Sequence, residues 1–208
     1  MAVVLGGGNG IYLASFAGPT PPPALDPDAV AFLSAAGITD PTIESAVNTL
    51  VVDLKGYSIW TKMKAIYPFV GGTASTHKWN LINPLDTNAA FRLTFNGGWT
   101  HSANGALPNG TNGYAETYFN ISSGFTTANR GSAGGYWRTP TPNVGGYLFG
   151  INDPVLSISS RFWIRTIGTA MDHYAGGAIL LRESGVTDFS GFRAMSRVAS
   201  NNLFAIKK

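Results

Sequence analysis

Two different spacings of apolar residues divide this chain. Between residues 40 and 56, apolar side chains recur every three or four positions, which places them along one side of an α-helix. They are Ile43, Ala46, Val47, Leu50, Val51 and Leu54. From about residue 70 onward, apolar positions instead alternate with polar ones, which is the spacing of half-buried β-strands. The chain is therefore predicted to begin with helices and to continue as a mainly β structure.

Start and stop signals delimit two or three short helices. Asp26-Pro27 provides an N-cap followed by proline at the first helical position, and Gly37 suits the end of that helix. Asp40-Pro41 repeats the start signal immediately before the apolar stripe. Residues 58–65 are expected to form a further short helix, which ends before Pro68 because proline disfavours helix at the preceding residue.

The strand pattern is clearest in three stretches, at residues 91–96, 156–165 and 192–198. In these stretches Phe91, Leu93 and Phe95 alternate with Arg92, Thr94 and Asn96; Leu156, Ile158, Phe162 and Ile164 with Ser157, Ser159, Arg161 and Arg165; and Phe192, Ala194 and Val198 with Arg193, Met195 and Arg197. Glycine pairs and Asn-Gly dipeptides supply the turns between them. About eight strands are expected, in an antiparallel jelly-roll sandwich of two sheets.

An uncharged arm precedes the first helix signal. Residues 1–25 are rich in glycine and then in proline, and the proline run is expected to be stiff and extended. Within the arm, residues 11–16 could add a strand to a sheet of this chain or of another. The candidate assembly residues are Ile11, Tyr12, Leu13 and Phe16. A disordered leader is the alternative interpretation of the same residues.

The predicted organisation has three parts. They are the extended arm at residues 1–25, a helical segment at residues 26–70 and a β-sandwich domain at residues 71–208. At 208 residues the chain is long enough to bury a substantial core.

Charge is sparse along the whole chain. Charged residues make up 12% of it, about half the usual share in a soluble protein. The 14 Lys and Arg exceed the 11 Asp and Glu by three, and the cations do not cluster as they do in nucleic-acid-binding proteins. We therefore expect no nucleic-acid partner. The composition suits a turn-rich β-protein with a polar but weakly ionic surface, and it also suits a subunit that is buried among neighbours.

Several other classes of protein are disfavoured. The chain has no cysteine, so disulfides and thiol chemistry are excluded. No Lys or Arg precedes Lys55, so the positive region of a signal peptide is missing. No run approaches the ~20 apolar residues of a membrane span. A soluble protein that is not exported by a standard signal and does not enter a membrane is expected.

The usual motifs of catalysis and cofactor binding are missing. The early glycines lack the spacing of a dinucleotide fingerprint, and no Gly-Lys-Ser/Thr occurs. His77, His101 and His173 lack metal-ligand spacing, and for the first two a structural hydrogen-bonding role is preferred. Glu116 and Glu183 lack the nearby acidic partner that a glycosidase of this fold would need. We predict no catalytic, cofactor-binding or metal-ligating residues.

Carbohydrate binding is the alternative that the residues leave open. Sugars stack on exposed aromatic rings, and Trp99 and Trp137 lie next to glycine-rich turns. Trp163 shares the polar side of its expected strand. These three rings are candidates for glycan stacking, and the other interpretation is that they cover the core or subunit contacts.

One part of the chain resembles a known family. Residues 53–80 (DLKGYSIWTKMKAIYPFVGGTASTHKWN), followed by residues 90–93, 97–101 and 107–114, are similar to a segment of structural proteins from tailed bacteriophages of Bacteroidetes-type hosts. In that family the segment links a short helical part to a concanavalin- or laminin-G-like β-sandwich. The resemblance implies the same arrangement here.

The function that the resemblance implies is structural. A non-enzymatic, tail- or capsid-associated virion protein is expected, which is assembled in the host cytoplasm with other virion proteins and further copies of itself as partners. The alternative is an adhesion module that contacts host surface glycans. The family's sandwich generally continues beyond the position of Lys208, so the sandwich here is expected to be shortened or to have an open edge closed by another subunit.

Overall fold

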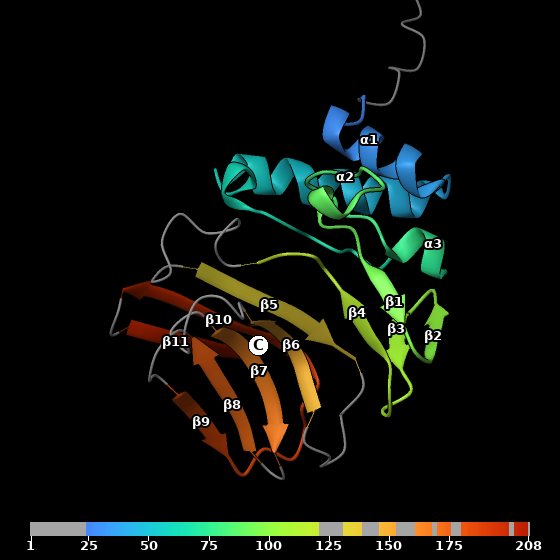
Figure 1. Ribbon diagram of the computed structural model, residues 1–208. Coiled ribbons are helices and arrows are strands. Elements are labelled where there is room, and N and C mark those ends of the chain that lie inside the picture. The colour runs from blue at the N-terminus through green and yellow to red at the C-terminus, as the bar shows by residue number, and fades with distance from the viewer. Residues whose placement is uncertain are drawn as a thin grey trace, which may run out of the picture.

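The computed structural model describes residues 24–120, 131–138, 146–152, 161–167, 170–175, 180–199 and 202–207. Within them the architecture is mixed, with more strand than helix, and short helices precede a set of small antiparallel sheets (Figure 1). The helical elements are α1 (Pro27–Ala36), α2 (Pro41–Gly56), the 3-10 turn η1 (Trp60–Lys62), α3 (Ala74–His77) and the 3-10 turn η2 (Asn88–Ala90). The expected arm residues Ile11, Tyr12, Leu13 and Phe16 lie outside the described residues.

Both long helices start and stop at the predicted signals. The Asp26 side chain accepts a hydrogen bond from the Asp28 backbone N–H at 3.0 Å, and Asp40 accepts one from the Thr42 N–H at 2.8 Å. Gly37 ends α1 in the left-handed conformation at φ 66°, which glycine adopts without a steric penalty. The local signals for α1 and α2 are therefore confirmed.

The helices share an apolar core of their own. Val47 and Val51 of the predicted stripe are buried in it, whereas Leu50 is 37% exposed. An ion pair between Lys55 and Asp26 at 2.6 Å joins the end of α2 to the start of α1. The buried members of this core are Ala29, Phe32, Leu33, Ala36, Ile38, Val47, Val51 and Leu81.

The strands form four antiparallel sheets. Two have two strands each and pair β1 (Thr94–Asn96) with β4 (Tyr114–Glu116) and β2 (Trp99–Ser102) with β3 (Gly105–Pro108). The three-stranded sheet has the order β11-β10-β5 and the four-stranded sheet the order β6-β7-β8-β9. Their bounds are β5 (Gly131–Trp137), β6 (Gly146–Asn152), β7 (Arg161–Ile167), β8 (Ala170–Ala175), β9 (Leu180–Ser184), β10 (Gly191–Ala199) and β11 (Asn202–Lys207).

The antiparallel pairing of the strands agrees with the sequence analysis, but the expected jelly-roll sandwich is not shown among the described residues. The helical elements and the connections between them occupy most of residues 24–93, which makes the protein mixed rather than mainly β.

Strand structure begins later than the spacing predicts. The first strand starts at Thr94, and residues 71–93 hold α3, η2 and turns. A capping box between Thr73 and Thr76 favours a helical turn at α3. Phe91 then adopts φ 59°, which turns the backbone and breaks the expected alternation of Phe91 with Leu93. The prediction of strand from about residue 70 is therefore wrong for this stretch.

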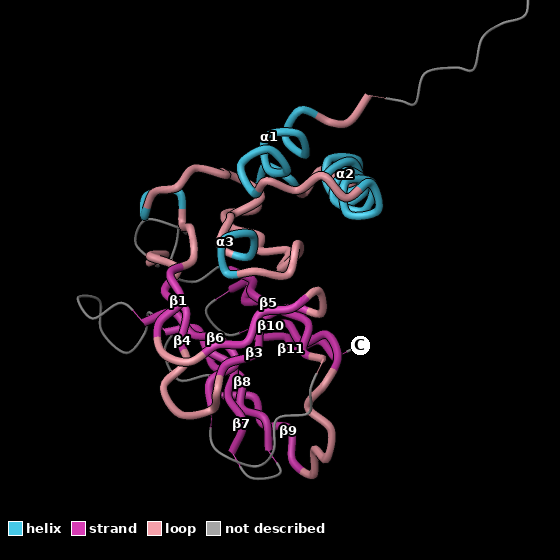
Figure 2. The backbone as a smooth tube through the Cα atoms, turned by 90° about the vertical axis from the view of Figure 1, so that its right-hand side faces the viewer, coloured by secondary structure: helices cyan, strands magenta, loops and turns pink. Residues whose placement is uncertain are grey.

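One apolar cluster draws on both of the larger sheets. Ile164 and Met171 come from the four-stranded sheet, Met195 comes from β10, and all three are fully buried. Val186 and Phe189 of the β9–β10 connection complete the cluster. Figure 2 shows β7 and β8 at the end of the molecule away from α1 and α2, and the cluster shares no buried member with the core of the helices.

Strand β10 is half-buried, but it buries its arginine-bearing side. Arg193 is fully buried and Arg197 is 5% exposed, whereas Phe192 is 39% exposed. An apolar side is ordinarily the one that faces the core, so β10 is reversed relative to its sequence pattern. The reversal is possible because the buried Arg193 meets Glu183 at 3.2 Å and donates to the Asp188 carbonyl at 3.0 Å.

Gly97 lies in the loop between β1 and β2, where it meets a second loop, the one between β3 and β4. It has φ 71°, and a Cβ there would collide with the backbone carbonyl of Asn112. The Asn109 side chain fixes this second loop by accepting backbone N–H groups from Thr111 to Gly113 at 3.0–3.1 Å. The second loop therefore cannot easily move away.

Replacing Gly97 with alanine should lower the free energy of unfolding by about 2–4 kcal/mol, because backbone strain and overpacking add. Gly110→Ala is the matched control, since Gly110 also has a positive φ of 75° but open space around it. It should cost only about 1 kcal/mol. Urea unfolding followed by tryptophan fluorescence measures both, and equal losses would contradict the collision.

Candidate functional site

The chain segment at residues 64–118, here called the junction, connects the helices to the two larger sheets. Figure 1 shows it as α3 and the strands β1 to β4 beside the helical layer. It contains most of the stretch that carries the family resemblance. The densest side-chain bonding in the described part of the chain lies here.

Asn80 is the central polar residue of the junction. Its side chain is completely buried, and its Oδ1 accepts the backbone N–H groups of Ile66 at 3.0 Å and Ile82 at 3.1 Å. Its Nδ2 donates to the carbonyls of Lys64 at 3.2 Å and Ala90 at 3.0 Å. One amide therefore satisfies four backbone groups from three separate stretches, of which the Ala90 carbonyl is buried and the others lie in partly buried surroundings.

His77 and His101 form a second internal contact, between α3 and β2. Their Nδ1 atoms lie 2.9 Å apart. The Gly72 backbone N–H donates to Nε2 of His77 at 3.2 Å, so this nitrogen carries no proton. A neutral His77 must then hold its proton on Nδ1 and donate it to Nδ1 of His101. This expected structural role of the two histidines is confirmed by the contact, which satisfies both ring nitrogens of His77 inside the protein.

Aromatic rings pack against both members of the histidine pair. Phe69 meets the ring of His77 edge-on at 5.6 Å between centroids, and Phe95 meets His101 at 4.6 Å. Burial, together with the nearby His101, lowers the pKa of His77 to about 4. Burial also lowers the pKa of His101. The pair is therefore neutral at physiological pH.

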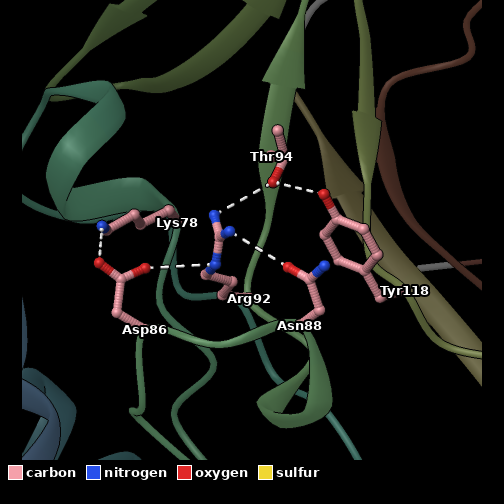
Figure 3. A network of polar contacts seen from close by, with 6 residues as sticks. All are labelled: Lys78, Asp86, Asn88, Arg92, Thr94 and Tyr118. Atoms are coloured by element: carbon pink, nitrogen blue, oxygen red, sulfur yellow. Dashed lines mark hydrogen bonds and ion pairs between the residues drawn. The ribbon is translucent and has the colours of Figure 1, made fainter.

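A polar network joins the outer side of the junction (Figure 3). Asp86 bridges two cations, with Lys78 at 2.6 Å and Arg92 at 3.2 Å. The hydrogen bond from Lys78 holds the pKa of Asp86 below its usual value. Arg92 also donates to Asn88 at 3.1 Å and to Thr94 at 3.2 Å, and Thr94 accepts from Tyr118 at 3.0 Å. The network thus ties η2 to β1 and to the chain after β4.

Replacing Arg92 with alanine is expected to lower the free energy of unfolding by about 1–2 kcal/mol. It removes two hydrogen bonds and one ion pair at a side chain that is 27% exposed. Arg92→Lys should recover only part of the loss, because an ammonium cannot reach Asp86, Asn88 and Thr94 at once. Thermal unfolding of the two variants tests this, and a lysine variant as stable as the native chain would contradict it.

The three tryptophans proposed for glycan stacking belong to three different sheets. Trp99 in β2 donates from Nε1 to the Asn96 carbonyl at 3.0 Å, and its ring contacts Phe95 edge-on at 5.1 Å. Trp137 in β5 stacks on Phe149 of β6 at 6.3 Å. Trp163 occupies a register position of β7 between Gly150 and Tyr174, and its side chain lies outside the described part of the protein. The first two rings are thus engaged with other aromatic side chains.

Ionisable side chains also meet between and beside the larger sheets. His173 is 1% exposed, and burial lowers its pKa while the nearby Glu183 carboxylate acts in the opposite direction. On the neighbouring strands Arg182 donates twice to the buried Asp172, at 2.6 and 2.9 Å. In the portions of the chain that the structure describes, no three His, Cys, Asp or Glu side chains gather where they could hold a metal ion.

The outer side of the three-stranded sheet, here called the outer face, is exposed because β10 is reversed. It carries Tyr136, Phe192 and Ile206, which are 70%, 39% and 48% exposed. The positions between them are small or hydroxylated, namely Ser132, Gly134, Ala194 and Ser196. None of these seven residues is charged. Sequence reasoning missed this surface because an apolar strand side is normally assigned to the core.

Comparison of the chain with models of known protein families, with curated proteins and with solved structures found no match. Of the helices described, none is both long and apolar enough to cross a bilayer.

Proposed function

We propose that this chain is a non-enzymatic structural protein of a tailed-bacteriophage virion, which assembles with other virion proteins. The observation that carries the proposal is the junction. The stretch that resembles the phage segment is the one whose polar side chains are engaged with one another and with the backbone. Asn80, His77 and Arg92 hold the helices and strands together, as a connector between an anchoring part and a projecting part requires.

The fold expected from the resemblance belongs to this proposal. We propose that the three- and four-stranded sheets are the two layers of a concanavalin- or laminin-G-like jelly roll. Support comes from the apolar cluster that both sheets share and from the ring of Trp137, which stacks on Phe149 of the other sheet. In this arrangement the N-terminal part anchors the subunit and the sandwich projects or contacts neighbouring subunits. Assembly takes place in the host cytoplasm.

Particle composition tests the proposed role directly. Phage particles would be purified by density gradient from a culture that carries the gene, and their proteins identified by mass spectrometry. The chain should copurify with the particles in a fixed ratio to the major capsid protein, and immunoelectron microscopy should then locate it. Its absence from intact particles, with the chain present in the lysate, would overturn the proposal.

A glycan-binding adhesion module is the second candidate. It is favoured by the neighbouring aromatic rings of Tyr136 and Phe192, which are register partners on the outer face. A glycan array of the purified chain is the test, with Trp99→Ala, Trp137→Ala, Trp163→Ala and Tyr136→Ala as variants. Saturable binding that one variant removes would support this function, and no binding to any glycan would remove it.

A further inference from the structure

The free edge of β5 differs from the other edges of the two larger sheets. The edge strand of a sheet has unpaired N–H and C=O groups, and proteins usually protect such strands with charged side chains or bulges. The edge strand β9 carries Arg182 and Glu183, β11 ends at Lys207, and β6 has a register shift between Tyr147 and Phe149. Strand β5 has neither device.

Strand β5 is also regular enough to serve as a template. All seven of its residues pair with β10 without a register shift, and no other described strand pairs with it. Its sequence, GSAGGYW, contains no charge and two adjacent small residues, Gly134 and Gly135. The outer face beside it is likewise uncharged. The partner that such an edge would accept is an extended, apolar and uncharged segment.

The chain itself contains such a segment. Residues 11–16 read IYLASF, and no charged residue occurs before Asp26. We propose that this segment from a second copy of the chain adds a strand to the free edge of β5. The inference rests on the proposed function, in which copies of the chain assemble, and it names the contact through which they do so.

The donor is a second copy because of where the segment is attached. Figures 1 and 2 both place α1, next to the first described residues, at the end of the molecule away from the sheet of β5. Pro19 and Pro21 to Pro23 separate residues 11–16 from α1. Proline-rich segments are extended and stiff, at about 3.1 Å per residue. Attachment at that end of the molecule through a proline-rich spacer therefore favours an acceptor strand on a neighbouring copy over the chain's own β5.

Disulfide trapping tests the contact and identifies the donor, because the native chain has no cysteine. One full-length chain would carry Ala14→Cys, and a second, of distinguishable mass, would carry Ser132→Cys or Tyr136→Cys. Mixing and mild oxidation should give the mixed disulfide-linked dimer. Ile206→Cys is the matched control, because it lies on the same outer face but at the charged β11 edge, and it should cross-link at least about tenfold less. Equal trapping at Ile206, or none at β5, would overturn the inference.

Solution mass supplies the second readout. Size exclusion with light scattering should show an oligomer for the full chain and a monomer for a chain that lacks residues 1–23. Ser132→Lys with Tyr136→Lys should weaken self-association about tenfold or more by charging the edge, and Ile206→Lys should not. An oligomer that persists without residues 1–23 but is lost in Ser132→Lys with Tyr136→Lys would mean that two outer faces pack together. That result would overturn the proposed role of residues 11–16. A glycan that protects Tyr136 in a chain that stays monomeric would also overturn the contact.

Failure here is distinguishable from failure of the proposed function. A chain that copurifies with particles but is not trapped at β5 would remain a virion protein with a different contact. A chain that is trapped at β5 but is absent from particles would assemble with itself for another purpose.

Discussion

Replacing Asn80 with alanine is expected to lower the free energy of unfolding by about 3–4 kcal/mol. The variant removes the partner of two backbone N–H groups and two carbonyls, which lie in buried or partly buried surroundings. Each unsatisfied buried group costs about 1–3 kcal/mol, and the lost side chain adds a small cavity. Few single substitutions of a polar residue reach this size.

Urea unfolding followed by tryptophan fluorescence measures this loss. Asn83→Ala is the matched control, since Asn83 is an exposed asparagine three residues away and should change stability by less than about 0.5 kcal/mol. Circular dichroism of the Asn80 variant should still show helix, because the contacts between α1 and α2 do not involve Asn80. A loss below about 1 kcal/mol would contradict the account and would mean that water replaces the amide.

Acidification from pH 7 to about pH 4.5 should destabilise the protein through its histidines. All three have lowered pKa values, with burial as the largest cause, and that of His77 falls from 6.5 to about 4. The unfolded chain therefore binds protons before the folded chain does. The stability that the neutral histidines contribute is present above about pH 6.5 and is lost as the pH falls toward the folded-state values. For His77 alone, the gap corresponds to about 3 kcal/mol.

Denaturant unfolding at a series of pH values tests the sign and the source. The free energy of unfolding should fall steadily between pH 6.5 and pH 4.5. Asp26 and Asp86 have lowered pKa values, so the stability that these two carboxylates contribute is lost at lower pH. His77→Gln should be less stable at pH 7 but should show a shallower pH dependence, whereas Asn83→Ala should keep the native slope. Parallel slopes for the native chain and His77→Gln would exclude the histidine pair as a source.

The parts of the fold that were predictable from sequence depend on neighbours along the chain. Asp26-Pro27, Gly37 and Asp40-Pro41 act within one helical turn, and the helices begin and end where these residues indicate. The strand prediction near residue 70 is wrong, because the Thr73 capping box is also a local signal and favours a helical turn there. Signals between residues close in sequence were therefore sufficient to predict where α1 and α2 begin and end.

The parts that could not be predicted depend on distant partners. The partners of Asn80 lie up to 16 residues away, and His101 is 24 residues from His77. A histidine or an asparagine in a loop gives no sign of which residue it will meet. Likewise, Arg193 can lie on the buried side of β10 because it forms an ion pair with Glu183 and a hydrogen bond to the Asp188 carbonyl. Alternation of apolar and polar residues shows that the two sides of a strand differ. It does not show on which side a charged residue will find partners that allow it to be buried.

The bonds of Asn80 also make the junction open as one unit. The amide protons of Ile66 and Ile82 are both held by the same oxygen, and the neighbouring Leu81 N–H is held by the Ile66 carbonyl at 2.8 Å. None of these protons can exchange with solvent by the fraying of a single turn, because releasing one weakens the others. The amide hydrogens of Ile66, Leu81 and Ile82 are therefore expected to exchange through a shared opening.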